Sequence, residues 1–391
     1  MNSYLKIKPI KSAFSILSFL LLTLTIENCK NTNSSRNGKS LLEAKQYQTA
    51  FIIKRGINIS HWLSQNLELT GVEENIFTEN DIEFLSKAGF DHLRIPVDEV
   101  KLWDINGNKR PIAFQKLHHT FALCQKYHLR VVLDLHIIRS HHFNNKKNLL
   151  WKSEIEKQHF INLWLELSSE FKKYSISFLA YELLNEPVAE NATDWNELYT
   201  RTILALRKTE PARTIIIGSN MWQSPATFHE LAVPQNDTNI ILSFHFYAPQ
   251  IITHYRAPWM DFSLYNGEVN YPGQAIDPEE LKNYSKEIIQ TISKYNGYFT
   301  RDTLLKLIRE PIDLARSKRL KLYCGEFGCL PSVRRTIRLQ WYKDVRYILE
   351  QNNIAWANWD YKGAFSIYNQ QTGSVDNNLI KVLLENDVIK N

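Results

Sequence analysis

Apolar and polar positions follow one another in two characteristic lengths from about Phe51 onward. Short runs rich in β-branched and other apolar residues recur eight times, and each has the length of a strand. Turn-forming or polar residues bound most of these runs. The runs predict strands at residues 55–60, 91–97, 129–136, 178–187, 213–219, 239–247, 320–328 and 354–361.

Longer stretches separate these runs, and in them apolar residues recur every three or four positions, as on one face of a helix. Strands that alternate with helices imply a parallel sheet, and eight such units are the number that closes a (β/α)8 TIM barrel. The helices are predicted at residues 80–89, 113–128, 154–174, 195–209, 281–295, 302–318 and 337–352.

A doubly wound open sheet is the competing architecture, because alternation alone does not show that the sheet closes. Such sheets commonly carry a glycine-rich turn after the first strand, where a nucleotide phosphate binds. The first predicted strand, RGINIS, holds a single glycine, Gly56, and it precedes the apolar residues. The sequence therefore favours the barrel.

Polar, charged and aromatic side chains occupy the last positions of the predicted strands. A polar side chain at the end of an apolar strand is costly unless it faces a wet pocket. In a barrel the carboxyl ends of all strands meet at one mouth, so these residues predict a single active site. They are Asn58, His61, Arg94, His136, Asn185, Glu186, Ser219, Asn220, His245, Tyr247, Glu326, Trp359 and Asp360.

Two carboxylates stand out among them. Glu186 lies in LLNEP at the end of the fourth strand, and Glu326 lies in CGEFG at the end of the seventh. A proton donor and an anion facing one another are what cleavage of a glycosidic bond needs. Pro187 and the glycines beside Glu326 favour an abrupt exit from each strand. Glu182, in the same fourth strand, is predicted to be a buried structural acid.

Beyond these two acids, the body from about Phe51 to Tyr368 resembles glycoside hydrolase family 5, the cellulase-type retaining (β/α)8 enzymes. Eight residues carry the resemblance, in the strand order of that family. They are Arg94 in LRIP, His136 in LDLH, Asn185 and Glu186 in NEP, His245 and Tyr247 in SFHFY, Glu326 in GEFG, and Trp359 in ANWDY.

The resemblance implies a role for each of these residues. Glu186 would be the general acid and then the base, and Glu326 the nucleophile that forms a glycosyl-enzyme. The acid needs a raised pKa and the nucleophile a low one. Arg94 and Tyr247 can donate hydrogen bonds that keep Glu326 ionised. Asn185 would bind the sugar 2-hydroxyl.

The same resemblance implies that His136 and His245 position hydroxyls and the acid, and that the sugar stacks on Trp359. No His-x-His pair follows the first strand, so neither a metal nor a cofactor is expected. The expected substrate is a β-linked polysaccharide or oligosaccharide.

Residues near these positions give further expectations. His61 and Trp62 follow the first strand and are predicted to contact the substrate. His141 and His142 either line a subsite or are merely exposed. Asp360 is as well suited to pairing with a cation as to contacting the ligand.

A connection of about seventy residues follows Tyr247, roughly twice the usual length. Its first part shows no sustained helical period. Aromatic rings at a barrel mouth suit the apolar faces of sugars, so we expect a wall of substrate subsites; the alternative is a loop packed on itself. The aromatic residues are Tyr255, Trp259, Phe262, Tyr265 and Tyr271.

Composition agrees with a large folded domain. Of 391 residues, 44% are hydrophobic and 23% charged, which excludes a disordered chain. The 10 Trp, 18 Tyr and 19 Phe supply either a large core or stacking surfaces. The net charge of +6 is too small and too dispersed to indicate nucleic-acid binding.

The N-terminus carries a predicted secretory signal, residues 1–29. A basic start and an apolar stretch precede a polar break at ENCK. Cys29 lies where bacterial lipoproteins are lipidated, so either lipid anchoring to a bacterial membrane or cleavage and release follows. Either route places the protein outside the cytoplasm, as a secreted, periplasmic or cell-surface protein. Residues 30–50 are a predicted polar linker and residues 51–391 the catalytic domain.

The other cysteines are Cys124, Cys324 and Cys329. The spacing of the last two matches no common metal site, and two buried thiols are favoured over a disulfide between them.

Taken together, these features predict an exported, monomeric, retaining β-glycosidase, foremost an endo-β-1,4-glucanase. The alternatives are another β-glycan specificity, namely mannan, xyloglucan, β-1,3-glucan or an exo-acting enzyme, and a carbohydrate-binding barrel without activity.

Overall fold

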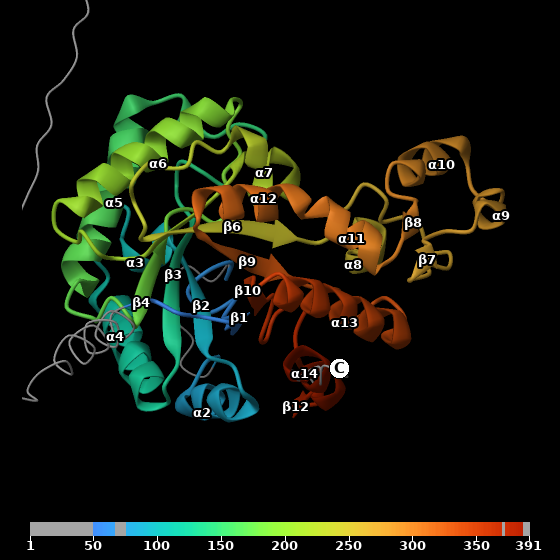
Figure 1. Cartoon of the computed structure of the whole chain (residues 1–391), viewed down its shortest axis with the longest axis horizontal. Coiled ribbons are helices and arrows are strands. Elements are labelled where there is room, and N and C mark those ends of the chain that lie inside the picture. The colour runs from blue at the N-terminus through green and yellow to red at the C-terminus, as the bar shows by residue number, and fades with distance from the viewer. Residues whose placement is uncertain (1–49, 67–75, 370–371, 386–391) are drawn as a thin grey trace, which may run out of the picture. The chain divides into compact units, whose positions relative to one another are not determined.

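The computed structural model describes residues 50–66, 76–369 and 372–385. Eight parallel strands close into a barrel in the order β1-β10-β9-β6-β5-β4-β3-β2 (Figure 1). The strands are β1 (Arg55–Asn58), β2 (His92–Asp98), β3 (Arg130–Ile137), β4 (Leu179–Glu182), β5 (Ile215–Gly218), β6 (Ile240–Phe246), β9 (Lys321–Phe327) and β10 (Ala355–Asn358).

Closure of the sheet is visible at its first strand, because β1 pairs in parallel with both β2 and β10. Every residue of β2, β4, β5 and β6 is buried. One face of each barrel strand points into the barrel interior and the other packs against helices. Both faces are therefore buried, which explains the nearly continuous apolar runs. All eight predicted strands are therefore confirmed, and so is the TIM barrel; the open sheet is excluded.

Helices pack around the barrel between successive strands. The main ones are α2 (Glu79–Ala88), α4 (Pro111–Lys126), α5 (Glu154–Phe171), α6 (Ala192–Arg207), α12 (Arg309–Lys318), α13 (Arg335–Gln351) and α14 (Asn377–Leu384). Shorter elements lie between them: α3 (Glu99–Leu102), η1 (Leu149–Trp151), α7 (Asn220–Gln223), η2 (Pro225–Glu230), β11 (Tyr368–Asn369) and β12 (Ser374–Val375).

Local chemistry sets where α2 begins and ends. The Asp81 carboxylate accepts a hydrogen bond from the backbone N–H of Thr78 at 2.8 Å, as in a capping box. Gly89 ends the helix at φ 110°, a left-handed conformation that costs glycine little.

The long connection between β6 and β9 differs in detail from the prediction. The expected helix at 302–318 divides at Ile308, because Pro311 has no N–H to donate and is tolerated only in a first helical turn. The expected helix at 281–295 divides at Ser285, which caps a new helix. The elements are α8 (Gln250–Thr253), β7 (Gly273–Gln274), α9 (Pro278–Leu281), α10 (Lys286–Ser293), β8 (Tyr298–Phe299) and α11 (Arg301–Leu307).

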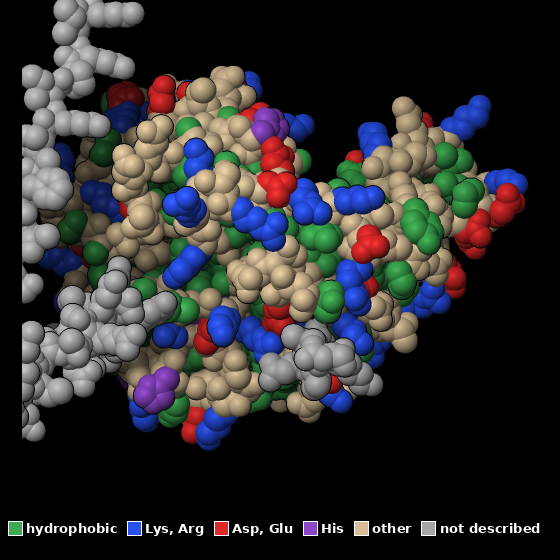
Figure 2. Space-filling view, viewed as in Figure 1, with side chains coloured by type: hydrophobic (Ala, Val, Ile, Leu, Met, Phe, Trp, Pro, Cys, Tyr) green, Lys and Arg blue, Asp and Glu red, His purple; other side chains and the backbone are tan. Residues whose placement is uncertain are grey.

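We call residues 250–307 of this connection, from α8 to α11, the arm. In Figure 1 the arm extends from the end of β6 away from the helices around the barrel. The arm is tied to α13, because Arg301 pairs with Asp344 at 2.6 Å and the Tyr271 hydroxyl donates to the same carboxylate at 2.9 Å. Figure 2 shows hydrophobic side chains exposed over the arm, where Leu264 and Tyr298 are both exposed. The predicted extended loop after the sixth strand is confirmed.

Two sequence predictions concern the cysteines and the N-terminus. Cys124, Cys324 and Cys329 are free and buried, so the favoured interpretation of buried thiols is confirmed. The predicted signal at 1–29, Cys29 and most of the linker at 30–50 lie outside the described residues. Within the described part of the chain, no helix is both long enough and apolar enough to cross a bilayer.

Candidate active site

A fully buried guanidinium, that of Arg94 on β2, connects the strand ends. Its Nε and Nη2 donate to the two carboxylate oxygens of Glu182 at 2.7 and 3.0 Å. Its Nη1 donates to Glu326 at 2.7 Å and to Asn58 at 2.9 Å, and Nη2 donates to Asn185 at 2.8 Å. Arg94 therefore fixes side chains from three other strand ends, and Glu182 is the buried structural acid that the sequence predicts.

Glu326, near the end of β9, is held at both carboxylate oxygens. Oε1 accepts from Arg94, and Oε2 accepts from the hydroxyl of Tyr247 at 2.7 Å. Burial raises the pKa of Glu326, whereas Arg94, His136 and the Tyr247 hydrogen bond lower it. The expected low pKa is thus opposed by burial, which is the larger effect.

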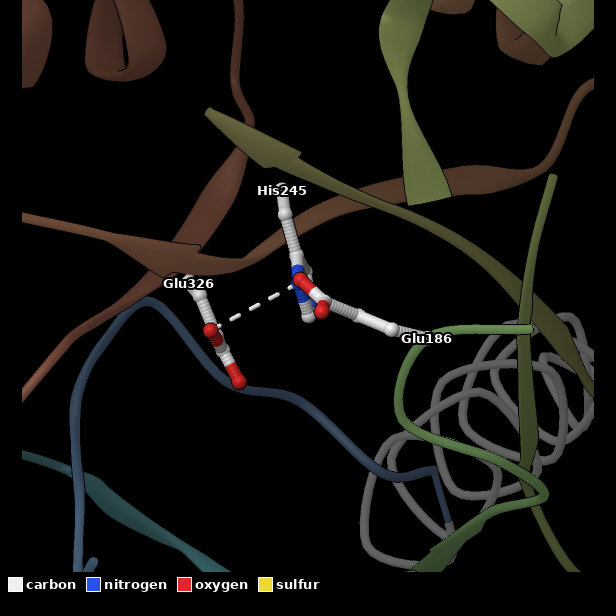
Figure 3. Close-up of side chains that lie close together, drawn as sticks. All are labelled: Glu186, His245 and Glu326. Atoms are coloured by element: carbon white, nitrogen blue, oxygen red, sulfur yellow. Dashed lines mark hydrogen bonds and ion pairs between the residues drawn. The ribbon is translucent and has the colours of Figure 1, made fainter. Parts of the chain in front are cut away.

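Glu186 lies just after β4, and its carboxylate is 2.8 Å from Nδ1 of His245 on β6. Figure 3 shows the carboxylates of Glu186 and Glu326 both beside this imidazole, and its Nδ1 lies 3.5 Å from Glu326. Burial raises the pKa of Glu186 well above its usual range, and the charge of Glu326 adds to the effect. Of these two acids, Glu326 is the one that accepts from Arg94 and Tyr247, so Glu186 is the one that keeps its proton.

The two acids are close enough to act on one bond. Glu186, His245 and Glu326 each offer a polar atom within 4.8 Å of the others. Inverting glycosidases need about 6.5–9.5 Å between carboxyl groups to admit water, whereas retaining ones hold them about 5–5.5 Å apart. A separation of at most 4.8 Å between the nearest oxygens is closer to the retaining range than to the inverting one.

The same three residues could in principle hold a cation, and they are the one such group among the residues that the structure describes. Both oxygens of Glu326 already accept hydrogen bonds, and the Arg94 cation lies 2.7 Å away. A second cation there would be repelled, so the donor set favours acid–base chemistry over metal binding.

His136, on β3, lies beside Trp359 with the rings parallel and their centroids 5.6 Å apart. Its Nδ1 is 2.7 Å from Asp134, and its Nε2 is 3.0 Å from the amide nitrogen of Gln65. Burial lowers the pKa of His136 to about 4 and raises that of Asp134 to about 7. His136 is accordingly neutral, and Asp134 and Gln65 hold its ring against Trp359.

The residues after β1 divide between the mouth and the core. His61 is partly exposed and lines a groove of about 1190 Å³ together with Gln65. Trp62 is only 4% exposed and packs against Phe77 at 5.6 Å between ring centroids. The predicted substrate contact at Trp62 is therefore wrong, because its ring belongs to the hydrophobic core.

The aromatic residues of the arm also divide. Trp259 is 58% exposed, and its ring meets the edge of His254, which in turn contacts Tyr247. The hydroxyl of Tyr255 instead donates to the backbone carbonyls of Asn266 and Gly267.

The remaining three aromatic residues predicted for the wall, Phe262, Tyr265 and Tyr271, are buried. For these three the alternative, a loop packed on itself, is what the structure shows. Tyr255 is engaged in the same packing through its hydroxyl, and Trp259 alone of the five stays largely exposed.

The neighbouring residues His141, His142 and Asp360 differ in burial. His141 is buried, and its Nε2 accepts from the backbone N–H of Val188, while His142 is partly exposed. Asp360 is fully buried and accepts from Ser60 at 2.5 Å. Burial raises the pKa of Asp360 to about 7.

Sequence reasoning missed three residues that support the site: Asp134, Gln65 and Gln223. Asp134 lies two residues before His136, so the period of two along a strand puts both on one face and could have revealed it. Gln65 and Gln223 lie in irregular segments at φ 55° and 52°, and no sequence period reveals them.

Comparison with known proteins agrees with this geometry. Residues 55–365 match the family described as Cellulase (glycosyl hydrolase family 5). The chain is 32% identical to Endoglucanase C of Acetivibrio thermocellus, over 84% of this chain and 97% of that protein. It is 27% identical to Cellodextrinase A of Ruminococcus flavefaciens, over 78% and 84% of the two chains.

Solved structures show the same fold. Cellulose synthase subunit Z of Clostridioides difficile is 27% identical, with a TM-score of 0.68 over 85% of this chain and 100% of that one. Cel5A of Thermotoga maritima, solved with mannotriose, has a TM-score of 0.70 at 22% identity, over 86% and 99%. The chain therefore belongs to glycoside hydrolase family 5 and is a glycoside hydrolase.

Proposed function

We propose that the protein is an endo-β-1,4-glucanase that acts by double displacement with retention of configuration. One observation carries the mechanism: an oxygen of Glu186 and one of Glu326 lie within 4.8 Å of each other, and only Glu326 accepts from a cation and a phenol, while burial raises the pKa of Glu186 well above its usual range. The substrate assignment rests on the relatives named as endoglucanases, one of them similar over 84% of this chain.

In the first step Glu326 attacks the anomeric carbon while Glu186 gives its proton to the leaving glycosidic oxygen. The C–O bond breaks, the shortened chain departs as an alcohol, and a glycosyl-enzyme ester remains. In the second step Glu186, now ionised, takes a proton from water as that water attacks the same carbon. Glu326 leaves, and the product keeps the β configuration.

The surrounding residues suit this chemistry. The Asn185 side-chain oxygen accepts from Arg94, so its amide N–H is the group that would meet the sugar 2-hydroxyl. With its proton on Nδ1, His245 donates to one oxygen of Glu186 and leaves the other to carry the acid proton. Trp359, backed by His136, is the proposed floor of the sugar site.

The nucleophile assignment is tested by Glu326→Gln, which preserves shape and removes the anion. We expect kcat on an aryl β-cellobioside to fall by at least about 10⁴-fold. The matched control is Glu287→Gln on the exposed surface of α10, with unchanged kcat. Near-normal turnover of Glu326→Gln, or product of inverted configuration by NMR, would contradict the mechanism.

Substrate specificity is tested on a panel of carboxymethylcellulose, mannan, xyloglucan and β-1,3-glucan, with sizing of the products. We expect the highest rate on the β-1,4-glucan and a rapid fall in its viscosity, because endo cleavage cuts within chains. A higher rate on mannan, release of single short sugars from chain ends, or binding without hydrolysis would each support an alternative.

We further propose that residues 1–29 direct export and that the protein acts as a monomer. Two outcomes stay open at Cys29: lipidation with membrane attachment, or cleavage and release. Metabolic labelling with palmitate distinguishes them, since lipidated wild type carries label that Cys29→Ala lacks. A protein found in the cytoplasm with residues 1–29 intact would overturn export, and light scattering of the purified protein tests the monomer.

A further inference from the structure

The segment after β5 has an unusual backbone. Met221, Trp222 and Gln223 are three successive residues at φ 55°, 63° and 52°, in the left-handed region. None is glycine, asparagine or aspartate, so each conformation is unfavourable on its own. Such backbone persists only where surrounding contacts hold it, and it is commonly found at functional sites.

The contacts that hold this segment lead to the chain that carries Glu186. The Asn220 side chain accepts from the backbone N–H of Ala189 at 2.9 Å and donates to its carbonyl at 3.0 Å. The backbone N–H of Trp222 donates to the carbonyl of Pro187, one residue past Glu186, at 3.2 Å.

The indole of Trp222 holds the segment from its other side. Its N–H donates to the carbonyl of Phe143, in the connection after β3, at 3.0 Å. The left-handed run is therefore joined to two neighbouring connections of the barrel mouth.

The side chain of Gln223 reaches the residues on the other side of Glu186. Gln223 is fully buried, and its amide nitrogen donates to Glu182 at 2.9 Å and to the backbone carbonyl of Asn185. It also lies 3.4 Å from the carbonyl oxygen of Leu184. Two consecutive strained residues, Trp222 and Gln223, therefore bind the backbone just after and just before Glu186.

The strand before this segment leaves room for the Gln223 side chain. A Cβ at Gly218 would lie 2.3–2.6 Å from three side-chain atoms of Gln223, closer than real atoms approach. Gly218 is thus needed where it is because the glutamine packs directly over its Cα. Gly218, the left-handed run 221–223 and the amide of Gln223 therefore all help to hold the backbone on either side of Glu186.

We propose that Gln223 is a positioning residue for the general acid: through the left-handed run 221–223, it holds the backbone on both sides of Glu186 so that the carboxyl meets the leaving oxygen. The inference rests on the proposed role of Glu186. Proton donation requires hydrogen-bond contact with the departing oxygen, so a small displacement of Glu186 slows it. The loss matters only for leaving groups that need a proton.

The test is Gln223→Met, which keeps the length of the side chain and removes its amide. We compare kcat/KM on cellotetraose, whose leaving alcohol needs a proton, with 2,4-dinitrophenyl β-cellobioside, whose leaving phenolate does not. We expect a fall of about 10- to 100-fold on cellotetraose and less than about 3-fold on the aryl substrate. Gln351→Met, at an exposed position on α13, is the control and should change neither value.

A second variant, Gly218→Ala, leaves the amide intact and forces it aside, so it should give the same selective loss. Thermal melting shows that each variant is folded, and Gly218→Ala keeps the comparison available if Gln223→Met does not fold. An equal loss on both substrates in a folded variant, or no loss on either, overturns the proposal. Glu186→Ala tests the underlying role separately, since it should lose cellotetraose hydrolysis and retain aryl cleavage.

Discussion

At the scale of single residues, the site contains one buried cation, Arg94, in contact with several buried acids. Arg94 lies within 3.1 Å of Asp134, Glu182 and Glu326. Burial raises the pKa of each of these carboxyls, and the charge of Arg94 opposes that rise. Glu326 has a second donor in Tyr247, which favours its ionised form over a protonated one.

This arrangement predicts the effect of Tyr247→Phe. The Tyr247 hydrogen bond lowers the pKa of Glu326, so its removal raises that pKa. Because the nucleophile must be ionised, activity at acidic pH falls first. We expect the acidic limb of the kcat/KM profile to move upward by roughly one pH unit, with the basic limb much less affected.

The matched control is Tyr298→Phe, since Tyr298 is an exposed residue of the arm. Its pH profile should overlay that of wild type. A Tyr247→Phe profile that falls in height at every pH without moving sideways would indicate that the hydroxyl does not tune Glu326.

At the scale of elements, aromatic side chains serve two purposes that their positions in the chain do not separate. Trp62 follows a strand end and Trp259 lies in a rim connection, so both are predicted to touch substrate. The first turns inward against Phe77, and the second stays in solvent beside His254. The direction in which a loop side chain points depends on which side chains of neighbouring elements are close enough to pack against it.

Alanine substitution separates the two roles. Trp62→Ala leaves a cavity in the core, so we expect a loss of about 3–5 kcal/mol in unfolding free energy and a lower Tm. Trp259→Ala removes an exposed ring, so we expect an unchanged Tm and a several-fold higher KM on a long β-glucan. Thermal melts and polymer kinetics measure both. A stable Trp62→Ala with raised KM would instead return that residue to the substrate site.

The attachment of the arm gives a further prediction. Asp344 on α13 accepts from both Arg301 and Tyr271, so Asp344→Ala removes the shared partner of two arm residues. We expect faster proteolytic cleavage between residues 250 and 300, at an unchanged rate elsewhere. Asp313→Ala on α12, away from the arm's attachment, is the control; equal cleavage of both variants would show that the contact does not hold the arm.

At the scale of the whole molecule, buried acids link stability to pH. Burial raises the pKa of Asp360 from 3.8 to about 7. The folded chain then binds more protons than the unfolded chain between these values, so this group lowers the unfolding free energy as pH rises through that interval. Acids with depressed pKa, such as Asp81, act in the opposite sense and mainly below that interval.

Asp360→Asn therefore should flatten the dependence of stability on pH. The amide cannot ionise, so the loss of Tm between pH 4 and pH 7 should be smaller than in wild type. Calorimetric melts across that range measure the slope. The conservative surface variant Asp302→Asn should leave the slope as it is, and an unchanged slope in Asp360→Asn would exclude Asp360 as a source of the pH dependence.

Much of the fold could be predicted because its cause is local. The strand-length apolar runs and the helical periods reflect which faces of the strands and helices are buried. In a barrel of alternating strands and helices, the same faces of each element are buried. The breaks at Ser285 and Ile308 were missed because the apolar period continues across them, while a cap and a proline decide where each helix begins.

The pattern of residues along the chain was enough to define the order of strands, the closed barrel and the set of polar residues at one mouth, because strand ends of a parallel barrel converge wherever they occur in the chain. Which of those residues touch depends on three-dimensional packing. Arg94 donates a hydrogen bond to Glu326, which lies 232 positions further along the sequence. Gln223, in a left-handed turn, donates a hydrogen bond to the backbone carbonyl of Asn185, the residue before Glu186. Contacts of that kind depend on distances between elements and on side-chain direction, which a linear pattern of apolar and polar residues does not contain.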